Sequence, residues 1–352
     1  MLGLRKERKQ VLFFFRGKGR GHAIVDAAIA NELVRLEPKL DITFVSYGMG
    51  AATLNDLGQN VIDLELPEDN PFWETMLRIT PQLQGHRPVL VLSHDEFCVP
   101  PQAKAFGLPV VFLTDRFTDP DSVEMQALRY ADQVVFLDDR GIYDEPPYLA
   151  GQVSYLGHVL RPLGSGGTDK VQSRRILGLP EDSTVILVCP GGSGMHSEAR
   201  TPLFDLVLGA CDSLDIGDKR LVWVAGEPDY PFLVEKSGSR QHLMILKPHY
   251  DFTPTIIAAD LVITKGNRLL LFECEALGIP SISISFAERF VDDSRLSRIQ
   301  TNIALRARGL DELALRDYII QALARASEIP EKSRCNMECH RLAVAKALRS
   351  HL

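Results

Sequence analysis

AADLVITKGNRLLLFECEALGIPSISISF, at residues 258–286, is the most informative segment of this sequence. It predicts a buried strand ending at Thr264, a turn at residues 265–267, a helix that carries Glu273, and a second strand after Pro280. Strands and helices that alternate over such short turns build a parallel sheet covered by helices. The segment therefore predicts an α/β fold.

The same alternation of apolar strands and helical segments runs through most of the chain. It breaks at residues 155–170, where Gly, Pro and Ser gather without apolar periodicity. A chain of 352 residues suits two domains at roughly 100–200 residues each. We expect a first domain at 1–158, a linker or hinge at 159–170, a second domain at 171–330 and a final helix at 331–352 packed on the body. The predicted strands are 11–15, 42–47, 89–93, 110–114 and 134–137 in the first half, and 184–190, 221–226, 243–246, 261–264 and 281–285 in the second.

Composition and charge exclude several classes of protein. Hydrophobic residues make up 45% and charged residues 24%, as in ordinary globular proteins rather than disordered ones. The 39 basic and 46 acidic residues give a net charge of −7, which offers no general attraction for nucleic acid. No apolar run approaches the roughly 18 residues of a membrane helix, and no signal-peptide core opens the chain. We expect a cytoplasmic protein with no transmembrane segment, whose basic first ten residues make at most weak peripheral contact with a membrane.

The cysteines do not suggest a disulfide framework or a metal centre. Cys335, Cys339 and His340 form the one cluster, but it lacks the paired spacing of zinc sites, so no metal site is predicted. Four further cysteines lie in or beside apolar patterns and are predicted to be buried thiols: Cys98, Cys189, Cys211 and Cys274.

A glycine-rich turn joins the first predicted strand to a helix that begins near His22. The glycines at Gly17, Gly19 and Gly21 let the backbone approach a ligand, and a helix N-terminus suits a phosphate or carboxylate. The spacing is G-x-G-x-G rather than G-x-G-x-x-G, and no acidic residue ends the second strand to bind a ribose. The turn therefore does not indicate a nicotinamide dinucleotide site.

His22 stands where the strand's carboxyl end meets the helix. With an ordinary pKa of about 6.5, its imidazole is mainly neutral at pH 7 and suits a general base. Alternatively, His22 contacts a diphosphate as a ligand, or it only makes a local hydrogen bond at the start of the helix. A second phosphate-compatible turn follows the strand at 184–190, and its residues are Gly191, Gly192, Ser193 and Gly194.

On these motifs the chain resembles the GT-B superfamily of glycosyltransferases, most of all the family of the N-acetylglucosaminyltransferase that makes the lipid-linked peptidoglycan precursor (glycosyltransferase family 28). That family carries a strand, a basic residue and a Gly turn, a helix with a Glu, and then A-x-G-x-P. Here the last motif reads Ala276 to Pro280. The resemblance implies an α/β fold of two Rossmann-like domains whose parallel sheets face across a cleft.

The resemblance also implies where the donor binds. It assigns the ribose hydroxyls to Glu273, although a helical Glu is otherwise most often solvated, and the base to the backbone near Pro248. The implied nucleotide-sugar site comprises Gly21, Gly191, Gly192, Ser193, Gly194, His249, Tyr250, Lys265, Gly266, Asn267 and Glu273.

Relatives often pair the cleft histidine with an aspartate from a later strand. The candidate here is Asp95, and His94 and Asp115 compete for the same place. Asn267 and Arg268 replace the small residues that the family usually has there. The acidic residue and Gln that relatives use for the donor sugar have no clear match at 286–303, which leaves the sugar open.

These features predict an inverting, metal-independent glycosyltransferase. It would move a sugar from a nucleotide diphosphate sugar, by resemblance UDP-linked, to the hydroxyl of a small-molecule or lipid-linked acceptor, with no cofactor. His22, supported by Asp95, would act as the base, while the second glycine turn, Lys265 and the helix at Asn267 would meet the diphosphate charge. The alternatives are a nucleotide-sugar hydrolase or epimerase, and a non-catalytic nucleotide-sugar-binding subunit.

Overall fold

The computed structural model describes residues 8–66, 72–163, 169–191, 197–248, 252–286, 296, 298–325 and 334–352. The chain divides into two compact units. The first unit consists of Met1–Arg161 and Asn336–Leu352, and the second consists of Pro162–Cys335. The C-terminal segment therefore belongs to the first unit, a question that the sequence left open.

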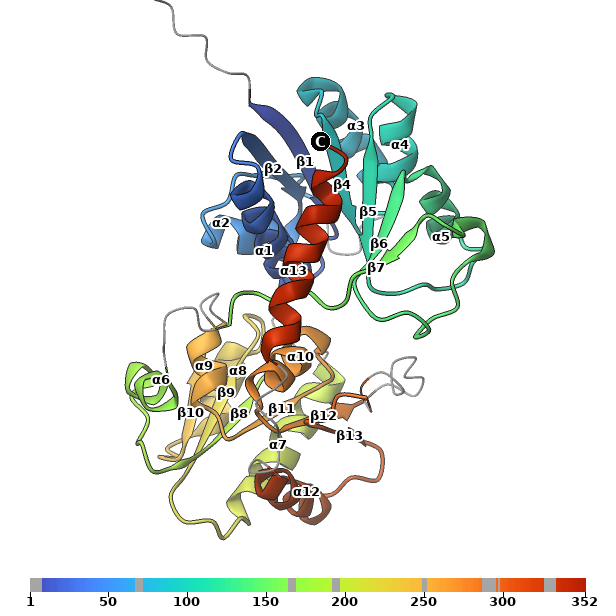
Figure 1. The fold of residues 1–352 in the computed structure, drawn as a ribbon. Coiled ribbons are helices and arrows are strands. Elements are labelled where there is room, and N and C mark those ends of the chain that lie inside the picture. The colour runs from blue at the N-terminus through green and yellow to red at the C-terminus, as the bar shows by residue number, and fades with distance from the viewer. Residues whose placement is uncertain are drawn as a thin grey trace, which may run out of the picture. The chain divides into compact units, whose positions relative to one another are not determined.

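The first unit is built on a seven-stranded sheet of described residues in the order β3-β2-β1-β4-β5-β6-β7 (Figure 1). Every neighbouring pair of strands is parallel. The side chains of Val11 to Phe15 are at most 1% exposed, as expected for a strand covered on both faces. The strands are β1 Lys9–Phe15, β2 Leu40–Ser46, β3 Val61–Asp63, β4 Leu90–His94, β5 Val110–Thr114, β6 Gln133–Phe136 and β7 Val153–Tyr155.

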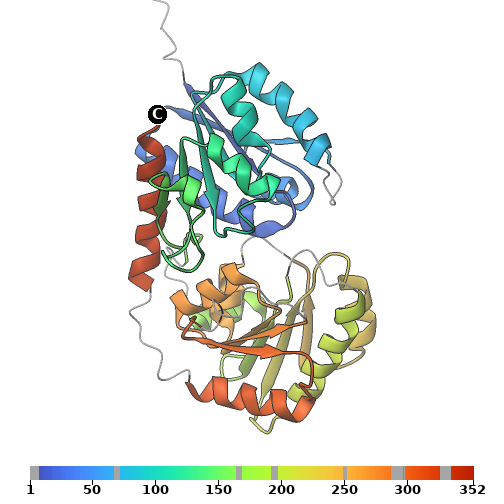
Figure 2. The same ribbon diagram turned by 90° about the vertical axis from the view of Figure 1, so that its right-hand side faces the viewer.

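Helices cover both faces of this sheet. Helices α1 and α13 lie on one face, and α3 and α4 lie on the other (Figure 2). Hydrogen bonds attach α13 to the unit: His340 Nδ1 donates to the His158 carbonyl at 3.2 Å, and His351 Nε2 lies 2.8 Å from Gln133 Oε1. The helices are α1 Arg20–Leu36, α2 Gly48–Asp56, α3 Phe72–His86, α4 Val99–Ala105, α5 Val123–Ala127 and α13 Arg334–Arg349, with short 3₁₀ turns at Leu128–Tyr130 and Pro147–Leu149.

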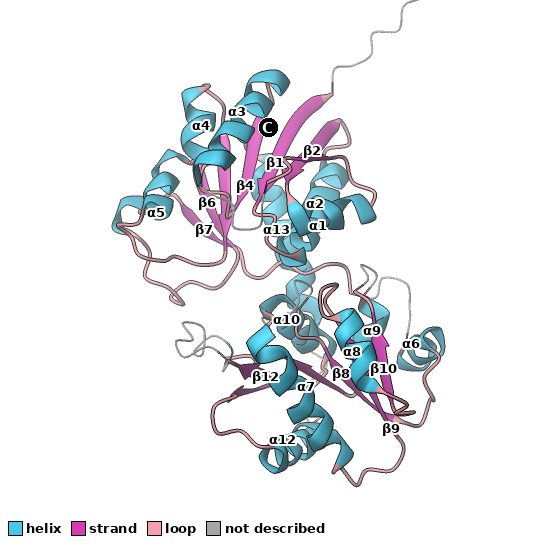
Figure 3. Ribbon diagram, turned by 180° about the vertical axis from the view of Figure 1, so that it is seen from behind, coloured by secondary structure: helices cyan, strands magenta, loops and turns pink. Residues whose placement is uncertain are grey.

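The second unit has a six-stranded parallel sheet of described residues in the order β10-β9-β8-β11-β12-β13 (Figure 3). One face packs Trp223 against α7 and α12, and the other packs Val262 against α9 and α10. The strands are β8 Thr184–Val188, β9 Lys219–Val224, β10 Leu243–Leu246, β11 Leu261–Thr264, β12 Ser281–Ser285 and β13 Asn302–Arg306. The helices are α6 Lys170–Leu177, α7 Ser197–Asp212, α8 Tyr230–Ser237, α9 Thr253–Ala258, α10 Arg268–Leu277 and α12 Glu312–Arg325.

Two predictions from the sequence concern the cysteines and the membrane-spanning helices. The four cysteines predicted to be core thiols are all buried, whereas Cys339 is exposed. None of the described helices has both the length and the apolar character that crossing a bilayer requires.

Candidate functional site

Most of the predicted site residues that the structure describes follow the central strands of each sheet, where the strand order reverses. In the first unit β1 lies between β2 and β4, and in the second β8 lies between β9 and β11. The loops after such central strands diverge to opposite faces and leave a crevice at the carboxyl edge. His22 and Asp95 follow β1 and β4, and Gly191 and Lys265 follow β8 and β11.

The turn after β1 needs its first glycine. A Cβ atom on Gly17 would lie 2.0 Å from the Tyr47 carbonyl oxygen, so no other residue fits without moving the backbone. The Gly17 carbonyl also accepts a hydrogen bond from Gly50 N at 3.0 Å. Helix α1 then begins at Arg20, and nothing lies within 4 Å of a Cβ built on Gly21. The packed turn thus leads into an open helix start that carries His22.

His22 contacts Asp95, the carboxylate that the sequence ranked first. Nε2 of His22 lies 3.2 Å from Asp95 Oδ2, and the two side chains are 26% and 2% exposed. Asp95 has a positive φ of 52° directly after β4, and its backbone NH bonds to the Leu113 carbonyl. This backbone turn places the carboxylate at the carboxyl edge of the sheet.

The electrostatics of Asp95 select one tautomer of His22. Burial raises the pKa of Asp95, but the hydrogen bond from His22 and the charges of His22, His94 and Arg116 outweigh it, so the pKa lies below its ordinary value. An ionised carboxylate only accepts hydrogen bonds, so Nε2 of His22 carries the hydrogen. In the neutral form of His22, Nδ1 then presents a lone pair, as a general base requires.

A second histidine–aspartate pair lies beside the first. His94 Nδ1 lies 2.6 Å from Asp26 Oδ1, and the side chains are 3% and 0% exposed. Burial raises the pKa of Asp26. The rings of His94 and His22 meet edge to face, with centroids 4.4 Å apart and planes at 87°. Sequence reasoning named His94 only as a competitor of Asp95 and missed Asp26, although its position four residues after His22 in an apolar helix was a usable signal.

The neighbouring Glu96 is also buried, and burial raises its pKa to about 7, partly opposed by the charge of Arg16. Its Oε2 has no hydrogen-bond partner among the described residues. The loop after β4 therefore carries two adjacent carboxyl groups whose pKa values are shifted in opposite directions. Sequence reasoning did not single out Glu96.

In the second unit, the side chain of Lys265 lies beside the turn after β8. A Cβ on Gly191, whose φ is 129°, would lie 3.6 Å from Lys265 Cε. Burial lowers the pKa of Lys265, and the negative charge of Asp229 opposes that effect. Arg200 Nε lies 2.9 Å from Asp229 Oδ1, and the side chain of Asp229 is 3% exposed. The buried carboxylate of Asp229 thus pairs with Arg200 and acts by its charge on Lys265, which lies beside Gly191. Sequence reasoning did not single out Arg200 or Asp229.

The helix after β11 forms as its sequence predicts. The side chain of Asn267 caps α10 by accepting from Leu270 N at 3.4 Å, and Gly278 ends the helix in the left-handed conformation. The turn before it uses Gly266 at φ 91°. Glu273 is 0% exposed, so it is not the solvated glutamate that a helical position most often carries.

Several predicted site residues lie outside the described residues: Gly192, Ser193, Gly194, His249 and Tyr250, together with the acidic segment at 287–295.

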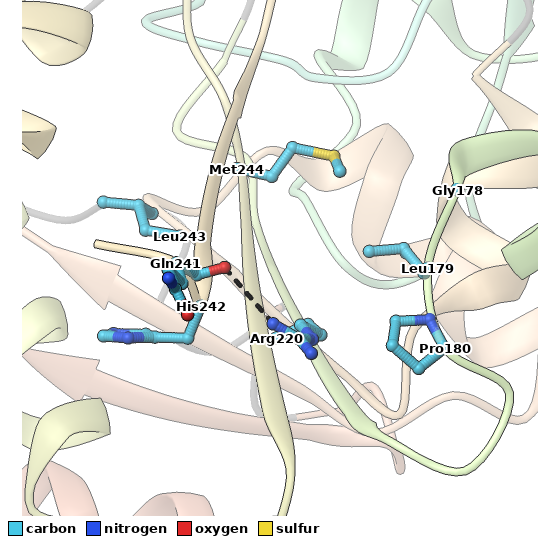
Figure 4. A pocket seen from close by; sticks show the side chains of 8 residues that line it. All are labelled: Gly178, Leu179, Pro180, Arg220, Gln241, His242, Leu243 and Met244. Carbon is cyan, nitrogen blue, oxygen red and sulfur yellow. Dashed lines mark hydrogen bonds between the residues drawn. The ribbon is translucent and has the colours of Figure 1, made fainter. Parts of the chain in front are cut away.

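A hollow of about 370 Å³ in the second unit lies away from these residues (Figure 4). It is open at the amino end of β9 and β10, where Arg220 donates to the Gln241 carbonyl at 3.2 Å. Its lining is Gly178, Leu179, Pro180, Arg220, Gln241, His242, Leu243 and Met244, none of which the sequence predicted for the site.

No protein-family profile matches the chain. Two curated proteins are similar in sequence. The UDP-N-acetylglucosamine–N-acetylmuramyl-(pentapeptide) pyrophosphoryl-undecaprenol N-acetylglucosamine transferase of Acetivibrio thermocellus is 28% identical over 114 residues, 32% of this chain and 30% of that enzyme. An uncharacterized glycosyltransferase of Methanopyrus kandleri is 21% identical over 254 residues, 68% of this chain and 70% of that protein. The match with the first of them spans less than a third of its length.

Solved structures match over nearly the whole chain. The glycotransferase of kitacinnamycin has a TM-score of 0.71 at 14% identity and covers 98% of this chain and 99% of its own. The UDP-GlcNAc 2-epimerase of Methanocaldococcus jannaschii has a TM-score of 0.65 at 13% identity and covers 97% and 99%. These likenesses confirm the fold that the sequence predicted.

Proposed function

We propose that this chain, which has the GT-B fold and resembles glycosyltransferases in sequence, transfers a sugar from a UDP-sugar to an acceptor hydroxyl, with inversion and without a metal ion. The observation that carries the proposal is the pair formed by His22 and buried Asp95 at 3.2 Å. The pair provides a base, because Asp95 holds Nε2 of His22 and so leaves Nδ1 to accept the proton. The uridine diphosphate follows the names of two similar proteins, the Acetivibrio transferase and the Methanocaldococcus epimerase.

The proposed reaction is a single displacement. The acceptor oxygen bonds to the anomeric carbon as its proton passes to Nδ1 of His22. The bond between the anomeric carbon and the diphosphate oxygen breaks, and its electron pair stays on the departing UDP. Asp95 stabilises the imidazolium that forms.

The second unit supplies the groups that meet the growing charge on the diphosphate. The turn at Gly191 follows β8, and Lys265 and the first turn of α10 follow the neighbouring strand β11. Arg200 lies in the first turn of α7, the helix that follows β8. Hydrogen bonds to charged groups are worth about 1.5–3 kcal/mol each, so a few of them hold a diphosphate without a metal ion. We assign the ribose hydroxyls to Glu273 by resemblance.

The acceptor belongs to the same proposal. We propose a small-molecule or lipid-linked acceptor and a cytoplasmic protein with at most weak membrane contact and no nucleic-acid partner. The net charge of −7 supports the last point.

A second candidate is an epimerase or hydrolase of nucleotide sugars, which the structural likeness to an epimerase favours.

One experiment distinguishes these functions. The protein is incubated with UDP-, GDP- and dTDP-sugars, with and without a panel of alcohol acceptors, and nucleotide release and product mass are followed. Transfer predicts release that depends on an acceptor and a product heavier by one sugar. Release without acceptor at a similar rate indicates a hydrolase, and an isomerised donor indicates an epimerase. Binding with no turnover of any donor leaves a binding subunit.

A further inference from the structure

Two elements of the first unit each contribute one histidine and one aspartate to a single cluster, of which only His22 is partly exposed. Helix α1 provides His22 and Asp26, which are four residues apart and so lie on one face of the helix. The end of β4 provides His94 and Asp95 in succession. The pairs form crosswise between the elements: His22 with Asp95 at 3.2 Å, and His94 with Asp26 at 2.6 Å.

The second pair lies too deep to meet a substrate. The side chains of Asp26 and His94 are 0% and 3% exposed, whereas that of His22 is 26% exposed. The ring of His94 nevertheless touches the ring of His22 edge to face, with centroids 4.4 Å apart. The buried pair therefore meets the reacting groups through His22, by this ring contact, and through the neighbouring Asp95.

We propose that Asp26 and His94 are positioning residues that hold the imidazole of His22 in the orientation its role as a base requires. This inference rests on the proposed function. The hydrogen bond to Asp95 fixes His22 at Nε2 only, and an imidazole held at one atom can still swing about that contact. Asp26 accepts from Nδ1 of His94 and so fixes the His94 ring, which then restrains the His22 ring through their edge-to-face contact. The direction of the Nδ1 lone pair of His22 is thereby set before the acceptor binds.

Energetics separate this role from a purely structural one. Removing one partner of a buried charged pair leaves the other uncompensated and destabilises the fold, whereas replacing both by apolar residues is often neutral. Asp26→Ala combined with His94→Leu nearly conserves the side-chain volume. Asp26→Asn keeps an oxygen that accepts from His94 Nδ1. These variants can separate the stability of the unit from the activity of His22.

The kinetic test compares His94→Leu, Asp26→Ala, the double variant and Asp26→Asn with the wild type. His94→Leu alone should lower the urea midpoint, and the double variant should recover it. The double variant should still lose roughly tenfold or more in kcat with the donor KM within about twofold, while Asp26→Asn stays within about threefold in kcat. Recovery of both midpoint and kcat in the double variant would overturn the proposal. So would a kcat for Asp26→Asn as low as that for Asp26→Ala, a comparison that stands if the double variant does not fold.

A second readout needs no transfer activity. The protein is labelled with ¹⁵N-histidine, and the ring signals of His22 are assigned with His22→Gln. Both proteins should carry the hydrogen on Nε2, which Asp95 holds, but the His22 ring signals should broaden in the double variant because its ring swings about that contact. Unchanged His22 signals in the double variant would contradict the proposal. If no donor is turned over, the proposed function fails but this measurement still decides the inference.

Discussion

Asp95→Asn tests whether the charge of Asp95 supports His22, because it replaces the buried carboxylate by a neutral amide of almost the same volume. The carboxylate lies 3.2 Å from His22 Nε2 and is 2% exposed, so water does not replace it. An asparagine can turn its amide NH₂ toward Nε2, and this favours the tautomer with hydrogen on Nδ1. That tautomer has no lone pair where the acceptor's proton must arrive.

The expected loss follows from the interaction removed. A hydrogen bond to a charged group contributes about 1.5–3 kcal/mol, and at about 1.36 kcal/mol per factor of ten this corresponds to roughly 10- to 150-fold in kcat. The tautomer change adds to that loss. The donor KM should change little, because Asp95 lies in the first unit and the residues proposed for the diphosphate lie in the second.

The assay is steady-state transfer with saturating acceptor, together with UDP affinity by calorimetry. Asp115→Asn is the matched control, since it makes the same substitution just beyond the end of the next strand, β5. Its kcat should stay near that of the wild type. If Asp95→Asn keeps a kcat within about threefold of the wild type, Asp95 does not support His22 and the reasoning is refuted.

Three further outcomes are expected. Glu273→Gln should weaken UDP binding by roughly tenfold or more in calorimetry, because a charged acceptor for the ribose is lost; Glu275→Gln on the same helix is the control, and equal affinities would remove Glu273 from the ribose site. Arg200→Ala should weaken pyrophosphate binding by roughly tenfold while exposed Arg175→Ala does not, and an unchanged pyrophosphate affinity would exclude Arg200 from an anion site. Glu96 has a pKa of about 7 in the fold against an ordinary 4.5, so the folded protein binds more protons between these values and its stability falls as pH rises through that window. The difference corresponds to about 3 kcal/mol, so urea midpoints at about pH 5 and pH 8 should differ less in Glu96→Gln than in the wild type, and equal differences would contradict the pKa.

Much of the fold could be predicted from the sequence, because parallel strands buried on both faces consist of continuous apolar runs. Ten predicted strands correspond to strands of the structure. The sequence did not reveal β3 and β7, which have three residues each, or β13, whose residues are only partly buried. Short or half-exposed strands contain no apolar run that the sequence would show. They form because they pair with neighbouring strands of the sheet.

The site was predictable where it depends on local motifs and not where it depends on distant contacts. Turns at the ends of strands were enough to predict His22, Gly191, Lys265 and Asn267 as site residues. Arg200 and Asp229 pair across 29 positions through the packing of α7 near α8, which no local pattern records. Asp26 was missed because its helix reads as an ordinary core helix unless its spacing from His22 is considered.

The most direct measurement of the central claim is the transfer rate of His22→Ala beside its affinity for UDP. His86→Ala is the control, because this histidine at the end of α3 pairs with Gln10 and is not among the site residues. The account predicts that kcat of His22→Ala falls by roughly 100-fold or more, the typical contribution of a general base, with UDP affinity unchanged. A loss of less than about tenfold with UDP affinity intact would contradict it.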